Sequence, residues 1–301
     1  MSRGAFDARF PDEEVCARYF AAKRWPAGFV CPACGVCKGW ELETKPFTWE
    51  CSGCHRQTSV RAGTVMHRSK LPLRTWFEAI HLLTSHSNGI SAEQAQAQLG
   101  IASYKTAWLL LQKLRRAMVS PDRVMLQDLV EADETEVPFR SKHDPIVGYG
   151  IPNVGKLLII GAIELSENGH PRRVRLEPLQ NRSGENVRGF VERNVKPGAA
   201  VVSDGLAGYR TLEDHKHIGK TVGTMAAHVL LPWIHRVFSN LKRWLTGTFH
   251  GVRKQHLKRY LDEFAFRWNR RRHTNTAFDT LLGLVTRLPH ASMRDFVDQR
   301  V

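Results

Sequence analysis

Four cysteines in the N-terminal part of the chain form two closely spaced pairs. Cys31 and Cys34 enclose Pro-Ala, Cys51 and Cys54 enclose Ser-Gly, and sixteen residues separate the two pairs. Each CxxC turn presents two thiolates to one side of a tetrahedral ion, and this spacing is typical of a zinc ribbon. The alternatives are two disulfides, which are rare in intracellular chains, or a redox motif, which does not come as a matched pair. We predict a structural Zn²⁺ site.

The residues around these pairs indicate a small β-module. Residues 39–42 and 47–50 alternate between polar and apolar side chains as strands do. Cys37 lies three residues beyond Cys34 and could compete as a ligand, whereas Cys16 lies outside the motif and reads as a small buried residue.

Two aspartates stand where a carboxylate is expensive. Asp133 interrupts a predicted strand at 130–137, and Asp204 directly follows another at 199–203. A carboxylate among apolar neighbours is costly unless it is paired or holds a cation. Carboxylates that converge across a sheet can hold two Mg²⁺ ions about 3.5–4 Å apart for attack on phosphate. The alternatives are that Asp204 and Gly205 form a simple turn and that Asp133 is solvated.

The charge of the chain indicates a polyanionic partner. Among 301 residues, 44 Lys and Arg oppose 29 Asp and Glu, which leaves a net charge of +15 and a pI near 9.9. This excess favours nucleic acid ahead of a membrane surface. No apolar run approaches the roughly 18 residues that a membrane span needs, and residues 1–20 lack the apolar core of a signal peptide. We expect a soluble, intracellular protein without membrane contact.

Hydrophobic periodicity predicts the helices and strands on which these residues lie. An apolar helical stripe begins near Arg74, and shorter helices at 92–99 and 106–118 enclose Gly100. Ser91 and Gln94 form a predicted capping box. The pair of helices has the outline of a helix-turn-helix that contacts DNA, or of a plain helical hairpin.

Beyond Pro121 the pattern is that of an α/β domain. We predict strands at 130–137, 156–164, 172–176 and 199–203, and helices at 184–194, 231–246, 254–271 and 277–288. The sequence thus predicts an α+β multidomain chain: a zinc ribbon with an N-terminal arm (1–70), a helical DNA-binding region (71–122) and a C-terminal domain (123–301).

Several short segments of the sequence, in the same order along the chain, resemble those of a known family. They are CPAC and CSGC, VEADETEV, VVSDGLAGY, SNLKRWLTGTFHG and HLKRYLDEFAFRWNRR. Together they resemble the zinc-ribbon DDE transposases of bacterial insertion sequences, the ISXO-like transposase family, and the likeness covers nearly the whole chain. It implies an RNase H-like catalytic domain that uses Mg²⁺ or Mn²⁺ to cleave DNA strands and transfer them.

The resemblance also implies which residues act. Asp133 matches the first acid and Asp204 the second. Relatives commonly place Glu seven residues before a Lys, and here His235 stands at that position before Lys242, which would hold a phosphate. Asn240 is the rival third ligand because its amide oxygen is a hard donor. Five residues separate it from His235 on a helix, so the two face different directions, and we favour His235 as the catalytic metal ligand.

The implied partner is double-stranded DNA, namely the terminal inverted repeats of the element and the target. Joining two ends implies a homodimer or a larger synaptic complex, at the nucleoid of a bacterial cytoplasm. Basic side chains on the C-terminal helices would face phosphates; they are Lys242, Arg243, Arg253, Lys254, Lys258, Arg259, Arg267, Arg270, Arg271 and Arg272.

Two other functions fit parts of the sequence. A zinc-ribbon, helix-turn-helix DNA-binding regulator with a non-catalytic C-terminal domain would explain a histidine in place of a carboxylate. A structure-selective nuclease of the same fold would cut DNA without joining it.

Overall fold

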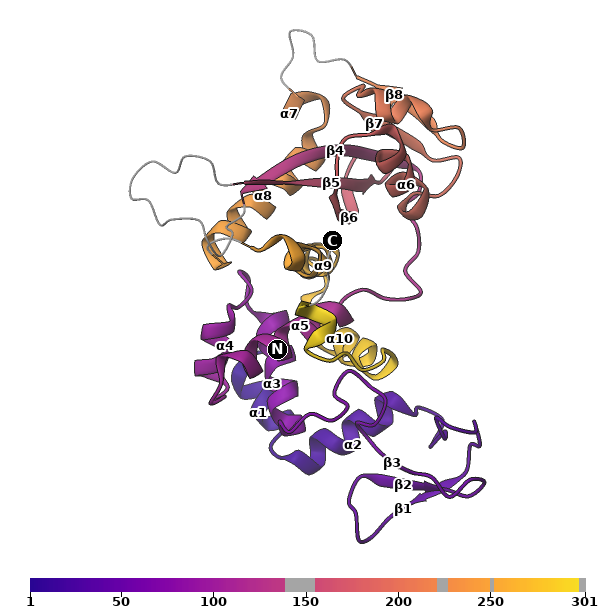
Figure 1. Cartoon of the computed structure of the whole chain (residues 1–301), viewed down its shortest axis with the longest axis vertical. Helices are drawn as coiled ribbons and strands as arrows, with labels where there is room; N and C mark the ends of the chain where they lie inside the picture. Colours follow the sequence, from indigo (N-terminus) through magenta and orange to yellow (C-terminus); the bar gives the residue numbers. More distant parts are fainter. Residues whose placement is uncertain (139–154, 221–226, 250–251, 298–301) are drawn as a thin grey trace. The chain divides into compact units, whose positions relative to one another are not determined.

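The structure is a computed structural model that describes residues 1–138, 155–220, 227–249 and 252–297. The chain divides into two compact units. Unit 1 comprises Met1–Ser120 together with the C-terminal stretch that begins at Arg272, and unit 2 comprises Pro121–Arg271 (Figure 1). Nowhere in these described ranges is a helix both long enough and apolar enough to cross a membrane.

Unit 1 contains the predicted zinc-ribbon module. Strands β1 (Gly39–Glu41), β2 (Thr48–Cys51) and β3 (Gln57–Ser59) form an antiparallel sheet in that order. The rings of Trp25, Phe29 and Trp49 pack on one another and on the buried thiols of Cys31 and Cys51. This small apolar cluster lies beside the two cysteine pairs and supplies the packing that so short a sheet lacks.

The remainder of unit 1 is helical. Its elements are α1 (Arg3–Arg9), α2 (Glu13–Arg24), α3 (Leu73–Ser85), α4 (Ala92–Gln98), α5 (Tyr104–Ala117), η3 (Thr274–Thr276), α10 (Ala277–Arg287) and α11 (Arg294–Val297). The predicted capping box at the start of α4 is present, with Ser91 and Gln94 bonded to each other's backbone N–H groups. Helices α4 and α5 match the predicted helix pair and pack together.

One predicted domain boundary is wrong. The N-terminal arm lies in unit 1 as helices α1 and α2, whose Phe6, Phe10 and Phe20 are fully buried. The third domain was predicted to reach residue 301, yet α10 packs on α2 and α3 and belongs to unit 1. The physical reason is aromatic burial, since the ring of Phe278 contacts those of Phe6 and Phe10.

Unit 2 is built on a five-stranded mixed sheet. Its strands are β4 (Leu129–Pro138), β5 (Lys156–Leu165), β6 (Pro171–Leu179), β7 (Ala200–Ser203) and β8 (Lys216–Gly219), in the order β6-β5-β4-β7-β8. Strands β6, β5 and β4 are antiparallel neighbours, whereas β7 is parallel to both β4 and β8. Four of the five strands were predicted; β8 was missed because it is short and mostly exposed.

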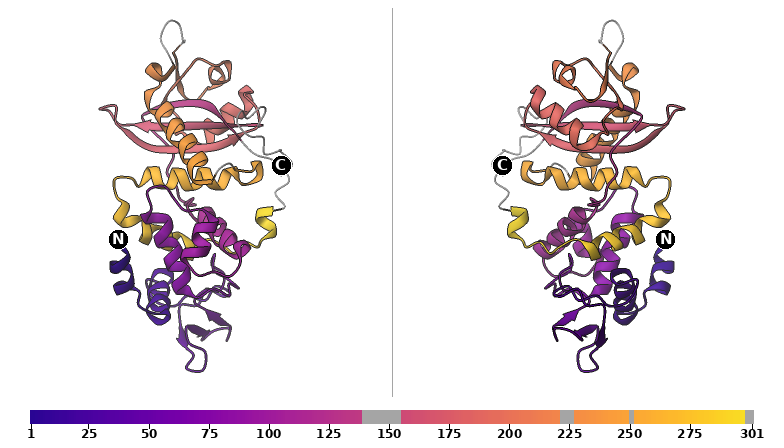
Figure 2. Two further views of the ribbon diagram at one scale, coloured as in Figure 1. Left: turned by 90° about the vertical axis from the view of Figure 1, so that its left-hand side faces the viewer. Right: turned by 90° about the vertical axis from the view of Figure 1, so that its right-hand side faces the viewer.

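Helices cover both faces of this sheet (Figure 2). Helix α6 (Gly184–Asn194) packs on one face with η1 (Ala207–Thr211). Helices α8 (Pro232–Phe249) and α9 (Leu257–Asn269) pack on the other, with the short α7 (Ala227–Leu230) and η2 (Lys254–His256) beside them. This strand order between two helical layers confirms the predicted RNase H-like α/β domain.

Helix α8 lies unusually close to the sheet at Gly161, in the middle of β5. A Cβ atom added there would lie 2.8 Å from Leu176 Cδ2, 2.8 Å from Phe238 Cε1 and 3.0 Å from Ile234 Cδ1. Two of these contacts are side chains of α8 itself. The missing side chain therefore determines how closely α8 can approach the sheet.

Substituting Gly161→Ala should destabilise the protein by about 1–3 kcal/mol, because the new methyl group must push α8 away from β5. Gly247→Ala, in helix α8, is the control, since nothing lies within 4 Å of the Cβ atom added there. That control should be neutral or stabilising by up to about 1 kcal/mol. Urea unfolding followed by tryptophan fluorescence measures both, and equal effects would contradict the packing argument.

Candidate functional site

The four paired cysteines form a compact thiol cluster in unit 1. Cys31 Sγ lies 3.6 Å from Cys54 Sγ, and Cys34 Sγ lies 3.5 Å from Cys51 Sγ. A tetrahedral zinc ion with Zn–S bonds of about 2.3 Å separates its sulfurs by about 3.8 Å. All four sulfurs lie within 4.8 Å of one another, so the donor set and its dimensions fit Zn²⁺.

The backbone favours the thiolate form that zinc binds at one thiol of the cluster, Cys31, whereas the sulfurs of Cys54 and Cys51 raise the pKa of the Cys34 thiol. Backbone N–H groups of Cys34 and Ala33 lower the pKa of the Cys31 thiol to about 6. Cys37 is not part of the cluster and contacts the Gly35 carbonyl oxygen instead. Cys16 is fully buried in α2, as predicted, and burial raises the pKa of its thiol to about 12.

The candidate catalytic residues of unit 2 are organised by strand β4. Successive side chains of a strand point to opposite faces of its sheet. Val130 and Ala132 belong to the apolar cluster on the α6 face. Glu131 and Asp133 point to the opposite face, where both contact residues of α8.

Asp133 is a buried carboxylate at the centre of this arrangement. Its side chain is 10% exposed, and burial raises the pKa of the carboxyl to about 7, while the N–H of Glu134 acts in the opposite sense. The negative charges of Glu134 and Asp204 raise that pKa further. An acid with this much buried negative charge nearby is a natural position for a cation.

Asp204 lies beside Asp133 because of the parallel pairing of β7 with β4. The pairs Val130–Val201 and Glu131–Val202 end the ladder, and two more residues along each strand bring the register to Asp133 and Asp204. The Asp204 carboxylate accepts the N–H of Leu206 at 3.0 Å, so it closes a turn, and its charge acts on Asp133.

The buried hydroxyl of Ser203 stabilises the turn at Asp204. Ser203 is fully buried, and its Oγ lies 2.9 Å from Nε2 of His217 on β8 and accepts the N–H of Gly205 at 3.2 Å. The side chain just before Asp204 is thus tied to the neighbouring strand.

The two rivals for the third position lie in different surroundings. His235 is in the first turns of α8, and its Nε2 lies 3.3 Å from Asp133 Oδ2. Asn240 and Lys242 are exposed farther along the same helix. The structure therefore brings His235, and not Asn240, next to the first acid.

The described residues of unit 2 contain no group of three His, Cys, Asp or Glu ligand atoms as closely spaced as the thiol cluster. Of the His, Cys, Asp and Glu side chains that the structure describes, only the four cysteines form a group of three or more within 4.8 Å of one another. Asp133 and His235 adjoin, and Asp204 is near enough to act on Asp133 electrostatically. Carboxylate oxygens suit Mg²⁺ or Mn²⁺, whereas an imidazole nitrogen is a softer donor than Mg²⁺ prefers.

Two further acids of β4 were missed in the sequence analysis. Glu131 accepts the backbone N–H groups of Trp233 and Ile234 at the start of α8, at 2.9 Å each. Glu134 points to the other face and accepts the Tyr209 hydroxyl at 2.6 Å. Burial raises the pKa of both carboxyls, and these hydrogen bonds lower it in part. The period-2 alternation of VEADETEV places Glu131 on the same face as Asp133, which was a signal for Glu131 alone.

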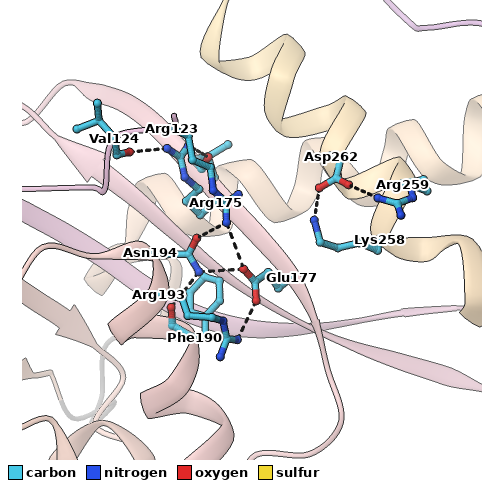
Figure 3. Close-up of polar contacts among 11 residues, drawn as sticks. Arg123, Val124, Arg175, Glu177, Phe190, Arg193, Asn194, Lys258, Arg259 and Asp262 are labelled. Atoms are coloured by element: carbon cyan, nitrogen blue, oxygen red, sulfur yellow. Dashed lines mark hydrogen bonds and ion pairs between the residues drawn. The ribbon is translucent and has the colours of Figure 1, made fainter. Parts of the chain in front are cut away.

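Part of the predicted basic surface is used inside unit 2. Lys258 and Arg259 both pair with the buried Asp262 on α9 (Figure 3). Arg267 lies 3.9 Å from Glu263, which is fully buried. These three cations are thus neutralised within the fold and are poor candidates for phosphate contact.

The same view shows a second internal network at the beginning of unit 2. Glu177 on β6 accepts hydrogen bonds from Asn194 at 2.9 Å and from Arg193 at 3.0 Å, while Arg175 donates to the Val124 carbonyl oxygen at 2.7 Å (Figure 3). The Glu177 contacts join β6 to α6, and the Arg175 contact attaches the segment that precedes β4 to the sheet.

Purified protein should contain about one zinc ion per chain, because four thiolates of suitable spacing form one site. Cys51→Ser should remove most of that zinc and destabilise the ribbon, since the metal contributes directly to folding. Cys37→Ser is the control and should keep the full zinc content. Metal analysis by mass spectrometry tests both, and loss of zinc from the Cys37 variant would contradict the ligand set.

Comparison with known proteins agrees with this geometry. The family of ISXO2-like transposase domains matches residues 125–269, and the family of transposase zinc-ribbon domains matches residues 11–57. A relative from Halobacterium salinarum, described as an uncharacterized protein in transposable element ISH50, is 25% identical over 290 residues, which cover 86% of this chain and 91% of that protein.

Two solved structures are similar at a lower level. The pre-cleavage Mos1 transpososome shares 11% identity over 70% of this chain and 78% of its own, with a TM-score of 0.24. The Mos1 strand transfer complex shares 11% identity over 69% and 78%, with a TM-score of 0.25. Values this low add nothing to the fold established by strand order.

The two family matches follow each other in the expected order, cover more than half of the chain, and coincide with the thiol cluster and with the RNase H-like sheet that carries Asp133 and Asp204. The chain therefore belongs to the zinc-ribbon, ISXO2-like transposases and is a DDE-type enzyme.

Proposed function

We propose that Asp133, Asp204 and His235 together hold the divalent ions, Mg²⁺ or Mn²⁺, with which this transposase cleaves and joins DNA strands. The observation that supports this most directly is the 3.3 Å approach of His235 Nε2 to Asp133 Oδ2, beside the turn that carries Asp204. Ions bound there would activate a water or a 3′-hydroxyl and stabilise the leaving oxygen.

His235 takes the place of a carboxylate in this proposal. A neutral imidazole is a competent ligand when its second nitrogen is suitably held. Asn240 lies five residues farther along α8, about 140° around the helix at 100° per residue, and is exposed. It therefore points away from Asp133 if His235 points toward it.

The other residues of the site would bind DNA. Lys242 is exposed on α8, two helical turns beyond His235, and so lies on roughly the same side of the helix. We propose that it holds a phosphate near the scissile bond. We further propose that the zinc ribbon and helices α4 and α5 bind the terminal inverted repeats. A dimer or larger complex would join both ends with target DNA. This reaction would occur at the nucleoid in the cytoplasm.

Strand cleavage and joining on duplexes taken from the DNA that flanks the gene, with Mg²⁺ or Mn²⁺, tests these roles. Asp133→Ala, Asp204→Ala and His235→Ala should each lower the rate at least about 100-fold, more than the roughly 10–100-fold typical of residues that only support a ligand. DNA affinity should change little in all three variants.

Two substitutions serve as controls. Asn240→Ala should keep nearly full activity, and His235→Glu should retain activity because it restores the carboxylate found in relatives. Loss of activity in Asn240→Ala with survival in His235→Ala would reverse the assignment. A wild-type chain that binds the ends but cuts them with neither metal would instead support the regulator, and cleavage without joining would support the nuclease.

A further inference from the structure

Helix α8 begins without a cap of its own. Its first residue is Pro232, and the first turn contains no acidic side chain. The first N–H groups of a helix have no partner inside the helix, and a side chain just before the helix usually accepts them. Here the preceding residue is Leu231, which has no acceptor in its side chain.

Glu131 supplies the missing acceptor from a distant part of the chain. Its Oε2 accepts the N–H of Trp233 and the N–H of Ile234, both at 2.9 Å, across more than one hundred residues of sequence. The side chain of Glu131 is buried, with only 5% of the residue exposed. A carboxylate at a helix N-terminus is also favoured by the helix dipole.

The position of Glu131 links this contact to the site. Residues two apart on a strand lie on the same face, roughly 6.6 Å apart, so Glu131 and Asp133 face α8 together. The N–H groups that Glu131 accepts belong to the two residues immediately before His235. One strand therefore holds both the first acid and the end of the helix that presents the third ligand.

We propose that Glu131 is a positioning residue of the active site, which fixes the start of α8 so that His235 meets Asp133. Its Oε2 accepts two backbone N–H groups at the start of the helix that carries His235, and through this contact it supports the ligand. This inference rests on the proposed role of His235 as a metal ligand. It assigns to Glu131 a function that its neighbour Glu134, on the opposite face, does not share.

The test is a double-mutant cycle read out by metal binding alone. Full-length protein is titrated with Mn²⁺, and free Mn²⁺ is followed by its electron paramagnetic resonance signal. Glu131→Ala should weaken Mn²⁺ affinity about 10–100-fold, as removal of a residue that orients a ligand typically does. Glu131→Gln keeps an oxygen that can accept the same N–H groups and should stay within about threefold of wild type.

The second dimension of the cycle asks whether the effect passes through His235. In a His235→Ala background, Glu131→Ala should change Mn²⁺ affinity by less than about twofold, because the ligand it positions is gone. Glu177→Ala is the matched control: it removes another carboxylate that accepts hydrogen bonds in unit 2, on β6, and should lower stability without changing Mn²⁺ affinity.

Each other outcome overturns the proposal in a distinct way. Unchanged Mn²⁺ affinity in Glu131→Ala would make the residue a purely structural cap. An equal loss in Glu131→Gln and Glu131→Ala, or an undiminished loss in the His235→Ala background, would make it a ligand in its own right. Should Glu131→Ala fail to fold, Glu131→Asp takes its place in both backgrounds, because its side chain is one methylene shorter and its oxygens no longer reach the N–H groups of α8. Unchanged affinity in His235→Ala alone would instead refute the proposed ligand.

Discussion

The burial of several acids on one strand is the constraint on which the catalytic unit depends. Strand β4 carries Glu131, Asp133 and Glu134 within four residues, and each carboxylate must find a partner as it leaves water. Glu131 is satisfied by the first N–H groups of α8 and Glu134 by the Tyr209 hydroxyl. Asp133 adjoins a histidine and a second acid instead. Glu131 and Glu134 thus hold neighbouring elements in place, and Asp133 is the acid for which we propose a role in metal binding.

Alternation along the strand distributes these demands over both faces of the sheet. The acids that face α8 set where that helix begins, and the acid that faces the other way fixes Tyr209, five residues beyond Asp204. The close approach of α8 to Gly161 completes the arrangement from the neighbouring strand. Contacts to β4, the central strand, and to its antiparallel neighbour β5 therefore fix the positions of elements from distant parts of the sequence.

A similar device recurs in unit 1. Helix α3 begins after Pro72 without a side-chain cap, and Glu13 of α2 accepts the N–H groups of Leu73 and Arg74 at 2.7 and 3.0 Å. In both units a helix that starts at or just after proline lacks a local acceptor, so a carboxylate from another element takes that role. This fixes the helix end relative to its neighbour more firmly than apolar packing alone, because hydrogen bonds are directional.

The sequence alone was enough to predict the ribbon cysteines, most of the strands and helices, and the candidate aspartates. Cysteine spacing, hydrophobic period and a capping box are local signals, and the motifs that carried the family resemblance are short and ordered along the chain. The folded chain was needed to show that His235 rather than Asn240 lies beside Asp133 and that α10 belongs to unit 1. It was also needed to show that Lys258 and Arg259 pair with Asp262 and that Glu131 caps α8. Most of these features depend on contacts between residues far apart in the chain. Hydrophobic periodicity predicts local helices and strands but not which distant residues meet.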